Sequence, residues 1–226
     1  MGFSPKWAWR LLWALLFTVS VSAADSTDAA TLQATVLVVN SAHVAPALLR
    51  LAERESARIF LSAGIEISWI NCGPDSFEGS CPAVEGSNQF VVHIVPRATT
   101  FADFVFGVAF LGDDGRGRYC DVFFAGIAAT KDQPEVRNFE LLGAVMSHEL
   151  GHLLLGSHSH SVFGIMMPVW DREGLRHIGM GDLSFTRQES SRIRARLGKE
   201  TLRNETRGPV VAIRREPSLL FLGRLQ

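Results

Sequence analysis

The sequence of 226 residues lacks any strong excess of charge. It contains 22 Lys and Arg residues and 23 Asp and Glu residues. Loss of Lys6 and Arg10 with the first 24 residues would leave 20 basic residues against 23 acidic ones, a net charge of about −3. This balance gives no sign of the basic surface that attracts phosphate groups. We therefore expect neither nucleic acid nor an anionic membrane as a partner, and nothing here indicates an oligomeric state.

Long hydrophobic runs are scarce, and the one clear run lies near the N-terminus. It extends from Leu11 to about Val21, follows Lys6 and Arg10, and is followed by small residues in 21–24. These three parts in this order are typical of a secretory signal peptide, and the run is short for a membrane span of ~20 residues. We predict a signal peptide over 1–24, export to the periplasm or the extracellular space, and no stable membrane insertion afterwards. An uncleaved anchor is the alternative.

Cysteine is also scarce, with Cys72, Cys81 and Cys120 in the whole chain. Export permits disulfide bonds. Cys72 and Cys81 would close a short loop, GPDSFEGS, that is rich in turn-forming residues. We therefore predict a disulfide between these two and a free Cys120, although three cysteines allow three pairings and the sequence cannot choose among them.

The order of the predicted elements indicates an α+β fold in one domain. Runs typical of strands occur at 31–40, 65–72, 90–98, 106–112 and 119–129. Helices are predicted over 45–64, 136–155 and 186–198, and the stretch between the last two, including the glycine-rich LRHIGMGDLS (175–184), is read as loop. The folded domain is assigned to 25–198, and the tail 199–226 is left without structure apart from a possible short strand at 210–213.

The long predicted helix contains the motif His148-Glu149-Leu150-Gly151-His152. Histidines four residues apart lie on one face of a helix, so both imidazoles can reach one ion. Glu149 is rotated off that face and can contact a water molecule bound to the metal. Zinc lowers the pKa of such a water toward ~7. Burying three unpaired polar side chains in so apolar a helix would cost several kcal/mol without a metal. We predict one Zn²⁺ per chain, with Glu149 as general base and then general acid.

The class of the metal site depends on a third ligand, for which two routes are open. A glutamate from a later helix is one route, and Glu189 is the candidate. The other route uses a third histidine just past the helix, followed by a turn that contains methionine. The chain offers Gly156, then His158 and His160, then Met166 in the stretch GIMMP.

This second route resembles the metzincin metalloproteases, whose pattern is H-E-x-x-H-x-x-G-x-x-H followed by a Met-turn. The resemblance covers about residues 139–170. It implies a zincin-like fold with a mixed twisted sheet, an active-site helix and a loop-rich C-terminal half, within a catalytic domain over 25–198. It also implies a secreted zinc-dependent endopeptidase that acts on a peptide or protein substrate. Met166 would be the Met-turn residue, packed beneath the histidines.

The glycine departs from that pattern by one position, because Leu155 stands where the metzincin glycine falls and Gly156 follows. If spacing from His152 governs, the third ligand is His158; if the glycine turn governs, His160 becomes available. The stretch HELGHLLLGSHSHSVFGIM also looks like a group of uncharacterised exported bacterial proteins with the pattern HELGHLLLG-x-x-x-H-S-x-x-GIM, in which His160 matches. We predict His148, His152 and His160 as the ligands, with His158 as the alternative. A non-catalytic zinc-binding protein of the same fold is the alternative function.

Overall fold

The computed structural model describes residues 32–73, 81–84, 86–98 and 105–207. The predicted signal peptide and the possible strand at 210–213 lie outside these described residues. In the part of the chain that is described, no helix is both long enough and apolar enough to cross a membrane.

The interior strand β1 (Leu32–Asn40) is apolar on both faces because both faces are covered. Ala34, Val36 and Val38 point into the main hydrophobic core, whereas Leu37 and Val39 join a smaller cluster on the opposite face. A strand buried on both sides reads as a continuous apolar run rather than as an alternating one. This explains the sequence ATVLVV in its middle.

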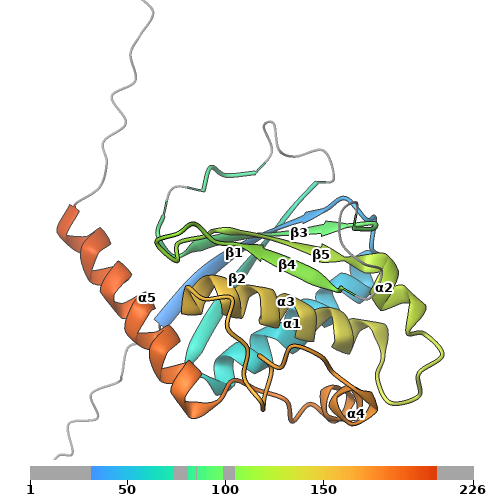
Figure 1. The fold of residues 1–226 in the computed structure, drawn as a ribbon. Coiled ribbons are helices and arrows are strands. Elements are labelled where there is room, and N and C mark those ends of the chain that lie inside the picture. Colours follow the sequence, from blue (N-terminus) through green and yellow to red (C-terminus); the bar gives the residue numbers. More distant parts are fainter. Residues whose placement is uncertain (1–31, 74–80, 85, 99–104, 208–226) are drawn as a thin grey trace, which may run out of the picture. The chain divides into compact units, whose positions relative to one another are not determined.

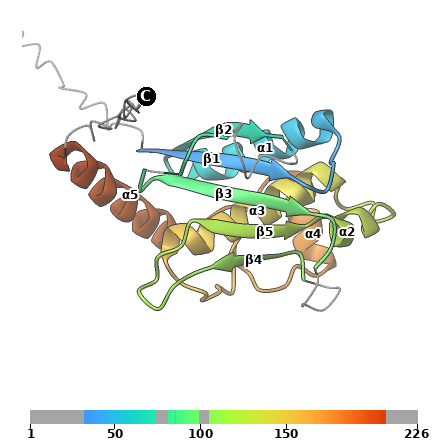
Figure 2. The ribbon, with the colours of Figure 1, turned by 90° about the horizontal axis from the view of Figure 1, so that it is seen from above.

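The described strands form one mixed sheet in the order β2-β1-β3-β5-β4 (Figure 1, Figure 2). The further strands are β2 (Ile65–Cys72), β3 (Gln89–Val95), β4 (Gly107–Phe110) and β5 (Tyr119–Phe123). Neighbouring strands are parallel except for β4, which pairs antiparallel with β5 at the edge of the sheet. The predicted α+β class with a mixed sheet is confirmed.

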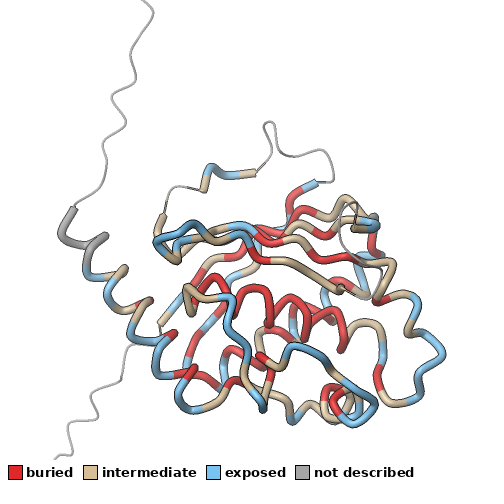
Figure 3. Tube along the Cα trace, viewed as in Figure 1, coloured by how far each residue is buried: buried red, intermediate tan, exposed pale blue. Residues whose placement is uncertain are grey.

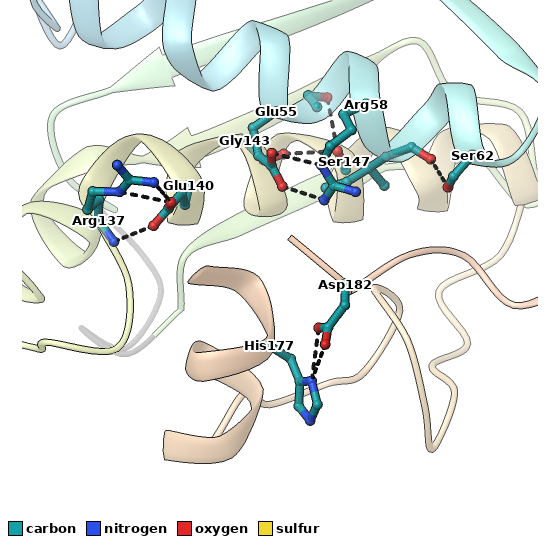
Figure 4. A network of polar contacts seen from close by, with 11 residues as sticks. Glu55, Arg58, Ser62, Arg137, Glu140, Gly143, Ser147, His177 and Asp182 are labelled. Carbon is teal, nitrogen blue, oxygen red and sulfur yellow. Dashed lines mark hydrogen bonds and ion pairs between the residues drawn. The ribbon is translucent and has the colours of Figure 1, made fainter. Parts of the chain in front are cut away.

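Two helices, α1 (Pro46–Ser62) and α3 (Asn138–Leu155), pack against the same face of the sheet and against each other (Figure 1). Gly143 permits their close approach, since a Cβ there would lie 2.6 Å from the backbone oxygen of Ala52. Ser147 on α3 donates a 2.9 Å hydrogen bond to Ser56 on α1. Figure 4 shows Ser147 together with other polar residues of the two helices. The helix that carries the histidine motif is therefore fixed between the sheet and α1.

Two regions differ from the predicted elements. The predicted strand over 119–129 ends at Phe123, and the alanine-rich Phe124–Ala129 continues as the short helix α2. The stretch read as a glycine-rich loop contains the helix α4 (Arg172–Met180), which the Asp171 side chain caps by accepting from the amide of Gly174 at 2.9 Å. One of its glycines serves close packing, because a Cβ on Gly179 would collide with the backbone oxygen of Glu135, and Gly181 ends the helix in a left-handed conformation. Glycine was thus a misleading sign of a loop.

The last described helix, α5 (Arg187–Arg207), begins close to the predicted position and runs nine residues past the predicted end at 198. On the outer face of the sheet, Cys72 and Cys81 are joined by a disulfide with Cα atoms 5.5 Å apart, and Cys120 is free and buried. The disulfide adds to the small apolar cluster on that face. Cys72 in this disulfide therefore offers no thiolate that could bind a metal ion.

Candidate metal centre

The histidine motif lies in a buried part of the fold. Every residue of α3 from Glu140 to Leu154 is buried, which Figure 3 shows as a continuous buried stretch. The helix ends where Gly156 adopts a left-handed conformation, with φ of 66°, and its amide donates to the carbonyl of His152 at 2.9 Å. Glycine takes this conformation without the strain that a Cβ would cause. The chain thereby turns back across the histidines.

The rings of His148 and His152 are each oriented by a backbone carbonyl. Nδ1 of His148 lies 2.8 Å from the carbonyl oxygen of Ile165, and Nδ1 of His152 lies 2.8 Å from that of Ser157. A carbonyl only accepts hydrogen bonds, so both Nδ1 atoms must carry the proton. The two Nε2 atoms then face each other, 3.0 Å apart, with lone pairs and no proton between them. Two such acceptors repel each other unless a cation lies near both.

His160 completes the group. One ring nitrogen from each of His148, His152 and His160 lies within 4.8 Å of the other two. The His160 ring stacks on that of His148 with centroids 5.3 Å apart. The alternative residue, His158, has its ring 5.9 Å from that of His152 and does not belong to the group. The structure therefore brings together the three histidines predicted as ligands and leaves His158 exposed beside them.

The three imidazoles are held in their neutral form, which is the form that binds metals. Burial lowers the pKa of His148 to about 4, and the neighbouring His152 and His160 lower it further, against the opposing effect of the Ile165 carbonyl. Burial also lowers the pKa values of His152 and His160. At neutral pH these side chains present lone pairs rather than positive charges.

Glu149 lies buried beside this group, only 6% exposed. Burial raises the pKa of its carboxyl group to about 8. Its side chain rests against the edge strand, because a Cβ built on Gly107 of β4 would lie 2.7 Å from both Cγ and Oε1 of Glu149. A buried carboxyl group next to lone pairs would be stabilised as a carboxylate by a cation at the histidines. Gly107 was not singled out from the sequence, where it reads as an ordinary strand residue.

The free energy of unfolding of the zinc-free protein should fall as pH rises from 6.5 to 8. Since the pKa of Glu149 is raised from 4.5 to about 8, the folded chain keeps a proton that the unfolded chain releases. This stabilisation is fully present below pH 4.5 and is lost as pH rises through 8, at up to about 1.4 kcal/mol per pH unit. The lowered pKa of His148 has the opposite effect, between about pH 4 and 6.5.

Urea unfolding of chelator-treated protein at pH 6.5 and 8 measures this fall. Glu149→Gln is the matched control, because the amide has nearly the same shape and does not titrate. The raised pKa is contradicted if wild type and this variant lose the same stability between the two pH values.

Met166 packs against the helix that carries the motif, and Glu189 binds the residue that follows His160. Met166 is fully buried, and a Cβ on Gly151 would lie 2.5 Å from its Sδ, so the thioether packs against the helix between the two histidines of the motif. Glu189 is buried and is already used: its carboxylate accepts from the amide of Thr186 at 2.7 Å and from the hydroxyl of Ser161. It caps α5 and is absent from the histidine group, which argues against the glutamate route to a third ligand.

One aromatic residue that sequence reasoning missed also contacts the centre. The Trp170 ring meets that of His148 edge-on, with centroids 5.5 Å apart. Trp170 lies in the stretch after Met166 and was read only as part of a loop. Nothing in its local sequence marks this contact, because the contact depends on how the loop returns to α3.

Two solved structures resemble the described chain. One is an archaemetzincin from Methanopyrus kandleri, with a TM-score of 0.50 and 15% identity over 74% of this chain and 96% of that one. The other is a zinc-dependent peptidase from Methanocorpusculum labreanum, with a TM-score of 0.42 and 16% identity over 72% of this chain and 99% of that one. The first of these likenesses settles the architecture. The fold is zincin-like. No family model and no curated protein matches the sequence.

The donor set of this zincin-like fold fits zinc. It consists of three neutral imidazoles and no thiolate, and tetrahedral zinc sites of three histidines are a common arrangement in proteins. Two of the rings are oriented by hydrogen bonds from the nitrogen that points away from the group, as is usual for histidines that bind metals. A positive charge at this position would stabilise both the facing Nε2 atoms and the carboxylate form of the buried Glu149.

Proposed function

We propose that this protein is an exported zinc metallopeptidase of metzincin type that hydrolyses peptide bonds in peptides or proteins outside the cytoplasm. The observation that carries the proposal is the convergence of His148, His152 and His160 beside the buried Glu149. Three protein ligands leave a fourth position open, which is the pattern of catalytic rather than structural zinc sites. Export rests on the signal-peptide pattern of residues 1–24.

The residues of the chain divide the reaction among them. His148, His152 and His160 would hold zinc, which when bound supplies a Lewis acid and lowers the pKa of water toward ~7. Glu149 accepts a proton from the attacking water and returns it to the leaving nitrogen. The carbonyls of Ile165 and Ser157 keep two of the rings oriented throughout. Met166 acts as the Met-turn residue, a packed floor that does not bind the ion.

Hydrolysis of a casein-type substrate by purified residues 25–226 tests the proposal. We expect activity in the zinc-loaded protein, loss of that activity after treatment with a chelator, and its return when zinc is added back. Circular dichroism before and after chelation shows whether the domain stays folded. A zinc-loaded protein that cleaves no substrate would favour the non-catalytic alternative, and a protein that takes up no zinc would refute the proposal.

Gly107→Ala should lower activity because the new methyl group would displace the general base. Its Cβ would lie 2.7 Å from Glu149 and 2.9 Å from the backbone oxygen of Asp121, so the carboxyl group has to move. Misplacing a catalytic group by about 1 Å costs up to about 100-fold in rate, and overpacking costs about 1–3 kcal/mol of stability. We expect kcat to fall about 10- to 100-fold with zinc content unchanged.

Gly112→Ala is the control for this variant. It lies in the same hairpin, but its Cβ would meet only the exposed carboxylate of Asp114, at 3.2 Å, and the backbone oxygen of Arg116, at 3.6 Å. Equal kcat values for Gly107→Ala, Gly112→Ala and wild type would show that the contact between β4 and Glu149 does not position the carboxyl group.

A further inference from the structure

A cavity of about 370 Å³ lies between the C-terminal end of α3, the hairpin that joins β4 to β5, and α5 (Figure 1). These three segments are far apart in the sequence. Leu154 and Leu155 of α3 supply an apolar part of the lining. The charged part consists of six side chains: Asp114, Arg116, Arg192, Arg196, Lys199 and Glu200. Four cations against two anions give this lining a net charge of +2.

The walls of the cavity are fixed against one another by close backbone contacts. A Cβ on Gly115 of the hairpin would lie 2.7 Å from the carbonyl oxygen of Gly156, and a Cβ on Gly156 would lie 2.8 Å from the carbonyl oxygen of Gly115. Arg196 attaches α5 to the same point, because its two terminal nitrogens donate to the Gly115 carbonyl at 3.2 and 3.1 Å. The cavity is therefore formed before any ligand enters it.

Arg196 lies where a positive charge is disfavoured. Burial lowers the pKa of its guanidinium, and the nearby Arg116 lowers it further, whereas Glu200 and Asp114 oppose these effects. The carbonyl of Gly115 accepts its hydrogen bonds but carries no full negative charge. An anion in the cavity would stabilise the charged guanidinium.

Two further cations of the lining are not neutralised. In the part of the chain that the structure describes, neither Arg192 nor Lys199 forms a hydrogen bond or an ion pair. Both lie on the same face of α5 as Arg196, because the three are spaced by four and three residues. Opposing them are Glu200 and the C-terminal end of α3, which is equivalent to about −0.5 charge. Positive charge therefore remains in excess on this side of the cavity.

We propose that this cavity binds a phosphate dianion, either free phosphate or the phosphoryl group of a monoester. Phosphate carries about −1.5 to −2 charges at pH 7, which balances the charge of the lining. Its tetrahedral oxygens can accept hydrogen bonds from α5 and from Arg116 of the hairpin at once, whereas a carboxylate accepts in one plane and carries a single charge. The inference does not depend on the proposed peptidase activity, since no lining residue belongs to the histidine group.

Isothermal titration calorimetry of the zinc-loaded protein with inorganic phosphate tests the proposal. The variant is Arg192→Gln with Lys199→Gln, which removes two cations and keeps long polar side chains on the helix. We expect it to bind phosphate at least about tenfold more weakly than wild type, because hydrogen bonds to charged groups are the stronger ones. Arg116→Gln, a variant in the hairpin, should weaken binding as well without altering α5. Acetate should bind wild type more weakly than phosphate, and equal affinities would contradict a site for a dianion.

Arg54→Gln with Lys131→Gln is the matched control. It removes the same two positive charges from exposed residues that do not line the cavity, and it should keep the wild-type affinity. An equal loss in this control would show only an effect of net charge. Unchanged affinity after substitution of Arg192 and Lys199 would place the phosphate elsewhere, for example on the zinc ion. Either result overturns the proposal, as does a wild type that binds no phosphate. Melting temperatures identify any misfolded variant.

Phenyl phosphate distinguishes the two sources of the dianion. Its ring can lie against the apolar part of the lining, formed by Leu154 and Leu155. If it binds more tightly than inorganic phosphate, and the substitutions at Arg192 and Lys199 weaken it equally, the ligand is a monoester with an apolar group. If it binds no more tightly, the ligand is free phosphate. Both results uphold the anion site.

Discussion

Glu149→Gln should retain a full equivalent of zinc and hydrolyse peptides about 10²- to 10⁴-fold more slowly than wild type, the usual contribution of a general acid–base group. Gln has nearly the same shape as Glu but cannot accept the proton of the attacking water. Glu149 is not among the three histidines that would hold the ion, so the metal should remain. The expected loss is therefore in kcat and not in metal affinity.

The stability of this variant makes the result interpretable. Burial raises the pKa of Glu149 to about 8, so in the zinc-free protein the folded state holds this carboxyl group largely in its neutral form at pH 7. Replacement by a neutral amide consequently removes no buried charge, and the variant should melt no more than a few degrees below wild type when both are free of zinc. Inductively coupled plasma mass spectrometry gives the zinc content, and initial rates on a peptide give kcat. A variant with full zinc and undiminished kcat would exclude Glu149 as the base.

His160→Ala should weaken zinc binding at least about 100-fold, whereas His158→Ala should leave it nearly unchanged. Loss of an outer partner of a ligand already costs 10- to 100-fold in affinity, and loss of a ligand itself should cost more. His160 stacks on His148 within the group of converging nitrogens, while His158 lies outside that group. The two residues differ by two positions and are both exposed, so each variant serves as the control for the other.

Competition with a chromogenic chelator measures both affinities, and the activity of each variant completes the test. The reverse pattern, with zinc lost only in His158→Ala, would assign the third position to His158. If both variants lose zinc, both histidines bind, and the open position that a catalytic site needs would be closed. In that case the non-catalytic alternative would gain support. If neither loses zinc, the third ligand lies elsewhere.

The sequence predicted the part of the centre that depends on local geometry. His148, Glu149 and His152 belong to one helix, and the 3.6-residue period alone puts the two imidazoles on one face. Their burial follows from the apolar residues around them. The same holds for the strands β1, β2 and β3, whose β-branched runs or alternating residues indicated their approximate bounds.

The part that depends on contacts between distant segments could not be predicted from local geometry, and the preference for His160 over His158 rested on a resemblance alone. The choice between His158 and His160 is made by the path of the chain after Gly156, which tertiary hydrogen bonds such as that from Ser161 to Glu189 fix. The place of Gly107 against Glu149 likewise depends on how β4 pairs at the edge of the sheet. One sequence contains no local sign of either contact. The missed helix α4 has a similar origin, because Gly179 lies inside the helix against the backbone of Glu135, and only Gly181 marks a turn, at the end of the helix.

The acceptors that orient His148 and His152 are main-chain carbonyls, and this determines which kinds of genetic change the centre can withstand. No amino-acid substitution at Ile165 or Ser157 removes the backbone carbonyl. Substitutions at these two positions therefore leave the ring orientations unchanged as long as the backbone follows the same path. An insertion or deletion between positions 157 and 165 changes the spacing between the two acceptors, so that the Ile165 carbonyl would be displaced from His148 while the Ser157 carbonyl stays beside His152. In related chains, this interval should therefore keep its length even where residues other than His160 and Gly164 differ.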